Sequence, residues 1–137
     1  PILSLSAASL QSAIAASTRT AEALGAAVNV AVVDVGGNLA AFLRMPGSFQ
    51  PSIDIAIDKA WTANGFGMST AELAAMLETQ PDMVRNGLLG RPRVAAFPGG
   101  LPIRRQGNLI GGIGVSGGSA EQDNEIALSG LKALTEY

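Results

Sequence analysis

The apolar positions of the chain fall into long stretches with helical spacing and shorter strand-like runs. Residues 6–24 are the first helical stretch, which Ser4 or Ser6 can cap and Gly25 can end. Four further segments carry helix signals, and two of them begin with the spacing of a capping box. These segments begin at Pro51 or Ser52, Ser69, Pro81 and Ser119, and they end near Gly65, Glu78, Gly90 and Tyr137.

The strand-like runs lie between these helical segments. Residues 28–34 and 38–44 flank the sequence Val35-Gly36-Gly37, which favours the tight turn of a β-hairpin. Residues 94–97 form another short apolar run, which we interpret as a strand leading into a glycine-rich stretch.

The stretch 99–118 holds eight of the seventeen glycines. We interpret it as a second hairpin, with strands over 101–105 and 109–115 and a turn at Gln106-Gly107-Asn108. Its outer glycines allow other backbone or a ligand to approach closely. The order of elements predicts an α/β fold of the α+β type, with about five antiparallel strands flanked by helices.

Residues 112–117 also match the G-x-G-x-x-G pattern of dinucleotide-binding proteins. That fold requires a second parallel strand with an acidic residue about 20 positions further on, whereas a helical segment follows here. Nucleotide binding is therefore disfavoured. The amides of residues 117–120 can still bind an anion at a helix start, although Glu121 and Asp123 already complement that helix dipole.

Composition narrows the function classes. The 137 residues are 47% apolar, 4% aromatic and 15% charged, with a net charge of −2. We expect a single domain over residues 1–137 that covers its alanine-rich surface by forming an even-numbered homo-oligomer. The weak charge argues against nucleic acid, and no apolar run reaches membrane-spanning length. We expect a cytoplasmic protein, or a secreted one if a leader has been removed.

The chain contains no cysteine and no histidine. This excludes thiol nucleophiles, disulfides, Ser-His-Asp triads and the usual zinc sites. We therefore expect no metal site, and the catalytic residues, if the protein is an enzyme, stay unassigned.

Four motifs together resemble one family: VAVVDVGGNLAAFLRM (30–45), SIDIAIDKAWTA (52–63), FPGGLPI (97–103) and GGIGVSG (111–117). In this order and spacing they resemble the GlcG/HbpS-like family over nearly the whole chain. The resemblance implies a profilin-like fold and assembly into dimers or higher even oligomers. It also implies a small-molecule ligand, with haem or a corrinoid as candidates.

Haem would need an unusual ligand set in this chain. Haem iron is held by imidazole, thiolate, thioether or phenolate groups, and the first two are absent. The cofactor is thus unassigned. The conceivable iron ligands are Lys59, Tyr137 and the four methionines, Met45, Met68, Met76 and Met83.

Polar residues within the four motifs are the candidate ligand-binding residues. Lys59 lies on a helix among apolar neighbours, where desolvation would suit acid–base or Schiff-base chemistry, or it pairs with Asp54 or Asp58. Arg44 either clamps a carboxylate or pairs with Asp34. The predicted ligand-binding set is Arg44, Ser52, Lys59, Phe97, Gly99, Gly100, Pro102 and Arg104.

Three function classes remain open at this point. The first is a small-molecule-binding protein whose pocket lies near residues 97–102 and the segment 44–59. The second is a cofactor-independent enzyme that uses Lys59, Arg44 or Asp34, and the third is a structural assembly protein. Asp34 precedes a glycine turn, which favours a turn-stabilising role.

An N-terminal proline such as Pro1 is also found in tautomerases. The rest of the chain does not resemble that family, so the similarity is superficial.

Overall fold

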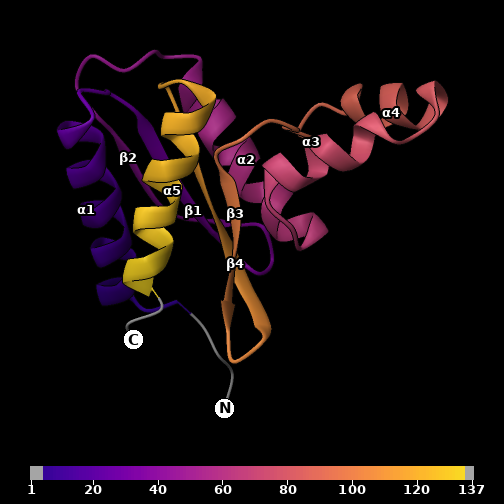
Figure 1. Cartoon of the computed structure of the whole chain (residues 1–137). Helices are drawn as coiled ribbons and strands as arrows, with labels where there is room; N and C mark the ends of the chain where they lie inside the picture. The colour runs from indigo at the N-terminus through magenta and orange to yellow at the C-terminus, as the bar shows by residue number, and fades with distance from the viewer. Residues whose placement is uncertain (1–4, 135–137) are drawn as a thin grey trace.

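The computed structural model describes residues 5–134, which form one antiparallel sheet with helices on both faces (Figure 1). The strands are β1 (Asn29–Asp34), β2 (Leu39–Arg44), β3 (Gly100–Arg105) and β4 (Asn108–Ser116). The helices are α1 (Ala7–Ala23), α2 (Ser52–Phe66), α3 (Thr70–Glu78), α4 (Asp82–Leu89) and α5 (Ala120–Leu134). The strand order is β2-β1-β4-β3, so β2 and β3 are the two edges.

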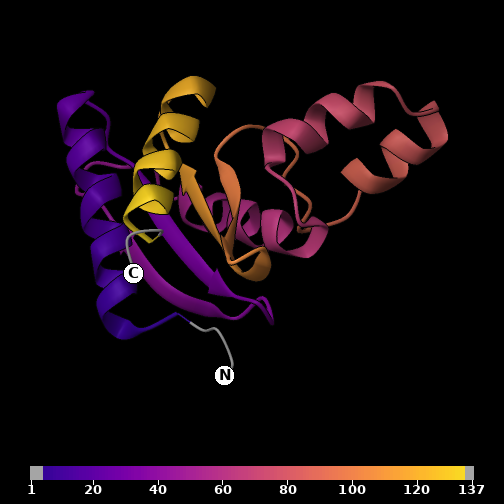
Figure 2. The same ribbon diagram turned by 60° about the horizontal axis from the view of Figure 1, so that its bottom comes forward.

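Helices α1 and α5 lie side by side on one face of the sheet, and α2 lies on the other (Figures 1 and 2). The larger core fills the α1/α5 side and includes Val30, Val32, Ile113 and Ile126. A smaller core under α2 contains Ala31, Val33, Ala56 and Ala60. Successive side chains of β1 point to opposite faces of the sheet, so the strand contributes to both cores.

The glycines of β4 explain how α2 packs against the sheet. A Cβ added to Gly112 would overlap the carbonyl oxygen of Ala60, and one added to Gly114 would overlap that of Ala56. Helix backbone thus rests directly on strand backbone. Close approach was expected at the outer glycines, and a Cβ added to Gly100 would indeed lie 2.5 Å from the carbonyl oxygen of Lys59; the inner glycines Gly112 and Gly114 also allow it.

Most predicted elements are present. Ser6 caps α1 and Gly25 follows its end with φ of 70°, while Gly67 ends α2 in the left-handed region. Ser69 accepts a hydrogen bond from the amide of Glu72 (3.1 Å), which confirms that cap. Ser119 and Gln122 satisfy each other's amides (3.1 and 3.0 Å) at the start of α5. The predicted continuation to Tyr137, and Pro1, lie outside the described residues.

The predicted strand over residues 94–97 is wrong, so the sheet has four strands. Hydrogen bonds to the side chain of Thr62 on α2 replace the backbone hydrogen bonds that a neighbouring strand would make. Its hydroxyl donates to the carbonyl of Arg93 (2.9 Å) and accepts from the amide of Ala95 (3.1 Å). The segment is therefore held as an extended loop on α2.

The G-x-G-x-x-G sequence runs through β4, which pairs antiparallel with both β1 and β3. It therefore lacks the parallel setting of a dinucleotide fold. Between residues 5 and 134, the helices are too short or too polar to cross a bilayer.

Helices α3 and α4 project from the sheet as an arm (Figures 1 and 2). Leu73 and Leu77 attach α3 to the body. The described residues of α4 include no buried side chain, and Met83 there is 86% exposed.

Candidate functional site

Lys59 lies at the β3/β4 side of the sheet, where it joins the two helical layers. Its side chain starts on α2 beside Gly114 and is fully buried. The ammonium donates to the carbonyl oxygen of Val115 (2.9 Å) and to Oδ2 of Asp123 on α5 (3.1 Å). A cation on one face of the sheet therefore pairs with an anion carried by the helix of the other face.

Asp123 is 4% exposed and is held from two sides. Its Oδ1 accepts a hydrogen bond from the amide of Gly118 (2.8 Å), while Oδ2 meets Lys59. The turn before α5 thus fixes the carboxylate in place. This pairing replaces the partners proposed from the sequence, because Asp58 instead pairs with Arg93 (3.2 Å).

Burial shifts both members of the pair toward their neutral forms. Desolvation lowers the pKa of Lys59 below 10.5, against the opposing charge and hydrogen bond of Asp123. Desolvation likewise raises the pKa of Asp123 above 3.8, against the Lys59 charge and the amides of Gly118 and Gly117. Burial therefore brings the pKa values of the two groups closer together than they are in water.

Phe97 covers the remaining side of the ammonium. Its ring centroid lies 4.4 Å from Nζ, which is a cation–π contact, and the residue is 45% exposed. Gly99 has φ of 129°, and an added Cβ there would lie 2.8 Å from Nζ. The Gly99 backbone therefore packs so closely against Val115, Lys59 and Asp123 that no side chain fits at this position.

Gly100 is packed against protein atoms as well. An added Cβ would lie 2.5 Å from the carbonyl oxygen of Lys59, and the Gly100 amide donates to the hydroxyl of Thr70 (2.9 Å). Four members of the predicted set, Lys59, Phe97, Gly99 and Gly100, therefore meet in one place. We call Lys59, Asp123, Phe97 and Gly99 the buried amine site.

The other four predicted ligand-binding residues lie elsewhere. Arg44 ends β2, and its guanidinium donates to the carbonyl of Ser48 (3.0 Å). Ser52 begins α2 beside the same loop. Pro102 pairs with Gly112 inside the sheet, and Arg104 donates to the carbonyl of Gly67 (2.9 Å). That these residues bind a ligand stays a prediction.

Asp34 takes the turn role predicted for it. Its Oδ1 accepts hydrogen bonds from the amides of Gly36 (2.9 Å) and Asn38 (3.0 Å). This carboxylate organises the β1–β2 turn and pairs with neither Arg44 nor Lys59 in the interactions described.

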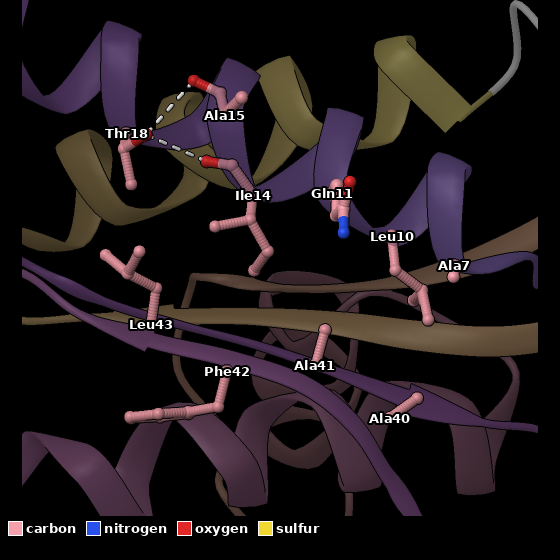
Figure 3. A pocket seen from close by; sticks show the side chains of 10 residues that line it. All are labelled: Ala7, Leu10, Gln11, Ile14, Ala15, Thr18, Ala40, Ala41, Phe42 and Leu43. Carbon is pink, nitrogen blue, oxygen red and sulfur yellow. Dashed lines mark hydrogen bonds between the residues drawn. The ribbon is translucent and has the colours of Figure 1, made fainter.

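A groove of about 570 Å³ lies at the opposite edge of the sheet, between α1 and β2. Figure 3 shows Leu10 and Ile14 of α1 pointing toward β2, with Ala41 and Leu43 facing them. Thr18 donates to the carbonyls of Ile14 (2.9 Å) and Ala15 (3.1 Å), so its hydroxyl is already engaged. The lining residues are Ala7, Leu10, Gln11, Ile14, Ala15, Thr18, Ala40, Ala41, Phe42 and Leu43. None of them is charged, and we call this the α1–β2 groove.

Two of the conceivable ligands for haem iron, Met45 and Lys59, are already engaged with other groups. The α1–β2 groove has no imidazole, thiolate or thioether among its lining residues. The Met45 sulfur lies in the core and accepts from the amide of Val28 (3.5 Å), and Lys59 is paired with Asp123. Within residues 5–134, no cluster of three acidic side chains can hold a metal ion. Tyr137 lies outside the described residues.

Sequence reasoning missed Asp123 as a site residue and missed the α1–β2 groove. A signal for Asp123 was present, because positions 123, 126, 127, 130 and 134 share the buried face of α5. An acidic residue on a buried helix face requires a partner. The groove has no such signal, because it exists only once α1 packs beside β2.

The antiparallel sheet between helical layers places the chain in the class of profilin-like α+β domains. Within that class it belongs to the HbpS-like family. The family model described as "Haem degrading protein HbpS-like" matches residues 5–132.

Solved structures agree over nearly the full chain. The protein ORFY of Klebsiella pneumoniae is 33% identical, with a TM-score of 0.89 over 98% of this chain and 92% of that one. A structure described as a PduOC–haem complex is 35% identical, with a TM-score of 0.87 over 96% of this chain and 95% of that one.

Two curated relatives match this chain over different shares of their own length. The corrinoid adenosyltransferase PduO of Citrobacter freundii is 37% identical over 98% of this chain, which spans 40% of that protein. Protein GlcG of Escherichia coli K12 is 33% identical over 75% of this chain and 74% of its own length. This chain therefore corresponds to one part of PduO.

Proposed function

We propose that this domain binds a planar tetrapyrrole, haem or a corrinoid-related ring, in the α1–β2 groove through apolar contacts with the ring. The observation that carries the proposal is the groove itself. Its volume, about 570 Å³, falls in the range of small-molecule pockets, and its lining is mostly apolar. The haem complex of the PduOC relative and the family description support this class of ligand.

Binding in this groove would rest on the ring and not on the central metal. The lining residues supply no axial ligand, and their one hydroxyl is bonded to helix carbonyls. Apolar contact contributes roughly 25 cal/mol for each Å² of surface removed from water, which is a sufficient source of affinity for a flat hydrophobic ring. A porphyrin without iron should therefore bind about as well as haemin.

Titrations with haemin and with metal-free protoporphyrin IX test the proposal. Haemin is followed by absorption and the free porphyrin by fluorescence. We expect saturable binding of both with similar affinities. Binding of haemin alone would contradict a mode based on ring contacts, and binding of neither would overturn the function.

The site is tested by filling the groove. Ala15 lines it, so Ala15→Trp should weaken binding of both probes at least tenfold because the indole occupies the ring's place. Ala8→Trp is the matched control, since Ala8 is exposed on the same helix and does not line the groove. Equal affinity in the two variants would place the ring elsewhere.

A further inference from the structure

A second site, independent of the α1–β2 groove, is present at the other side of the sheet. Lys59 is a fully buried amine with three N–H donors, of which two meet Val115 and Asp123. The third side faces the ring of Phe97. This side of the ammonium is thus in contact with an aromatic residue that is itself 45% exposed.

Phe97 is suited to act as a gate. It lies in the 94–99 loop, outside any strand, and is 45% exposed, whereas the ammonium under it is not exposed at all. Movement of this one side chain would remove the ring that contacts Nζ without breaking a backbone ladder. The space vacated would be that of one phenyl ring, beside the Gly99 backbone, which carries no side chain.

Asp123 can accept the proton that the Lys59 ammonium must lose before it acts as a nucleophile. It lies 3.1 Å from Nζ, and the Gly118 amide fixes its orientation. Desolvation brings the two pKa values toward each other, so transfer of a proton from Lys59 to Asp123 costs less here than in water. A neutral amine beside a carboxylic acid is the pair that imine formation uses.

We infer that Lys59 is an imine-forming amine for a small aldehyde or ketone, gated by Phe97 and assisted by Asp123. The ligand is no larger than the ring that it replaces. The site requires neither metal nor cofactor to form the imine.

The proposed step balances. The proton of Lys59 passes to Asp123, and the amine lone pair attacks the carbonyl carbon while the carbonyl π pair moves to oxygen. A proton moves from nitrogen to that oxygen, which gives a carbinolamine. Asp123 then protonates the hydroxyl, which leaves as water while the nitrogen lone pair forms the C=N bond. The products are a protonated imine on Lys59, water and the Asp123 carboxylate.

Reductive trapping tests the inference on the unmodified protein. The folded chain is incubated with acetaldehyde and sodium cyanoborohydride, and ethylated peptides are identified by mass spectrometry. The chain has only one other lysine, Lys132, which is exposed and serves as an internal reference. We expect Lys59 to be ethylated at least as fast as Lys132, despite its burial.

The denatured chain shows that both lysine peptides are detectable. Labelling of Lys132 alone in the folded protein, with both labelled after denaturation, would overturn the inference. Preferential labelling of Lys59 in the folded state, lost on denaturation, supports it.

Variants then test the roles of Phe97 and Asp123 separately. Phe97→Ala should raise the rate of Lys59 labelling severalfold, whereas Phe49→Ala, which truncates a 68% exposed phenylalanine in another loop, should not. Asp123→Asn should lower the rate, and Glu121→Gln in the same first helical turn is its control. An unchanged rate in Phe97→Ala would refute the gate, and an unchanged rate in Asp123→Asn would refute the acid.

Discussion

Gly114 in β4 lies directly under the carbonyl of Ala56 in α2, with no room for a side chain between them. The same holds for Gly112 under Ala60. Backbone contact of this kind fixes the height of α2 above the sheet, and with it the position from which Lys59 reaches across to α5.

Replacing Gly114 by alanine should therefore destabilise the protein strongly. The methyl group would overlap helix backbone, and such overpacking costs about 1–3 kcal/mol or more. Gly65→Ala is the matched control, because nothing lies near its added Cβ and alanine favours the interior of α2. Urea unfolding of both variants measures the free energies. Equal free energies of unfolding for Gly114→Ala and Gly65→Ala would show that α2 can move away from the sheet without loss of stability.

Removing the Lys59 amine should be costly as well. Lys59 is fully buried, and its ammonium pairs with Asp123. Breaking a buried ion pair from one side costs roughly 3–5 kcal/mol because the other charge is left without compensation.

A double-mutant cycle measures the coupling energy between Lys59 and Asp123. Lys59→Met should be strongly destabilised, and the Lys59→Met/Asp123→Asn double variant should recover part of the loss. Asparagine still accepts the Gly118 amide but carries no charge. Additive losses in the two single variants would mean that the pair is not energetically coupled.

The stability of the wild type should also depend on Asp123 as the pH rises. Its folded pKa lies above the ordinary value of 3.8, chiefly through burial. The stabilising contribution of the protonated form is therefore complete below pH 3.8 and is lost as the pH rises through the folded pKa. The wild-type free energy of unfolding, minus that of Asp123→Asn, should fall over this range. A difference that stays flat or rises with pH would contradict the raised pKa.

Bound haemin should lack the spectrum of a six-coordinate low-spin iron. The chain has no histidine or cysteine, and the Met45 sulfur is engaged with the Val28 amide. Absorption spectra of the haemin-loaded wild type and Met45→Leu should accordingly be the same. A sharp low-spin spectrum that disappears in Met45→Leu or Lys59→Met would establish an axial ligand that we do not expect.

We expect an even-numbered oligomer in solution. Leu39 on the edge strand β2, and Met83, Val84 and Leu89 on α4, are large apolar residues left exposed outside the groove. Sedimentation velocity at micromolar concentration measures the assembly state. A strict monomer would mean that these surfaces stay in water.

The sequence predicted most of the fold because its signals are local. Serine caps, terminating glycines and two hairpin turns each act over a few residues, and nearly every element bounded by them is present. The strand at 94–97 failed because Thr62, on a distant part of the chain, satisfies that backbone instead. Local pattern carries no information about such a partner.

The candidate site was also predicted only in part. The 97–100 turn and the helix of Lys59 were predicted to meet, and they do. The identity of the counter-charge was not predicted, because Asp123 comes from the opposite helical layer and reaches Lys59 only around the end of the sheet. Arg44 and Arg104 occupy different ends of the fold and bond to backbone carbonyls, which sequence spacing could not reveal.

Helix α4, whose described residues bury no side chain, has a consequence for how the domain can diverge. Its amides should exchange with solvent far faster than those of β1 or β4, because opening it exposes almost no apolar surface. Its length and surface can therefore change without repacking either core. The arm is the place where a descendant of this domain can acquire a new partner while keeping both the groove and the buried amine.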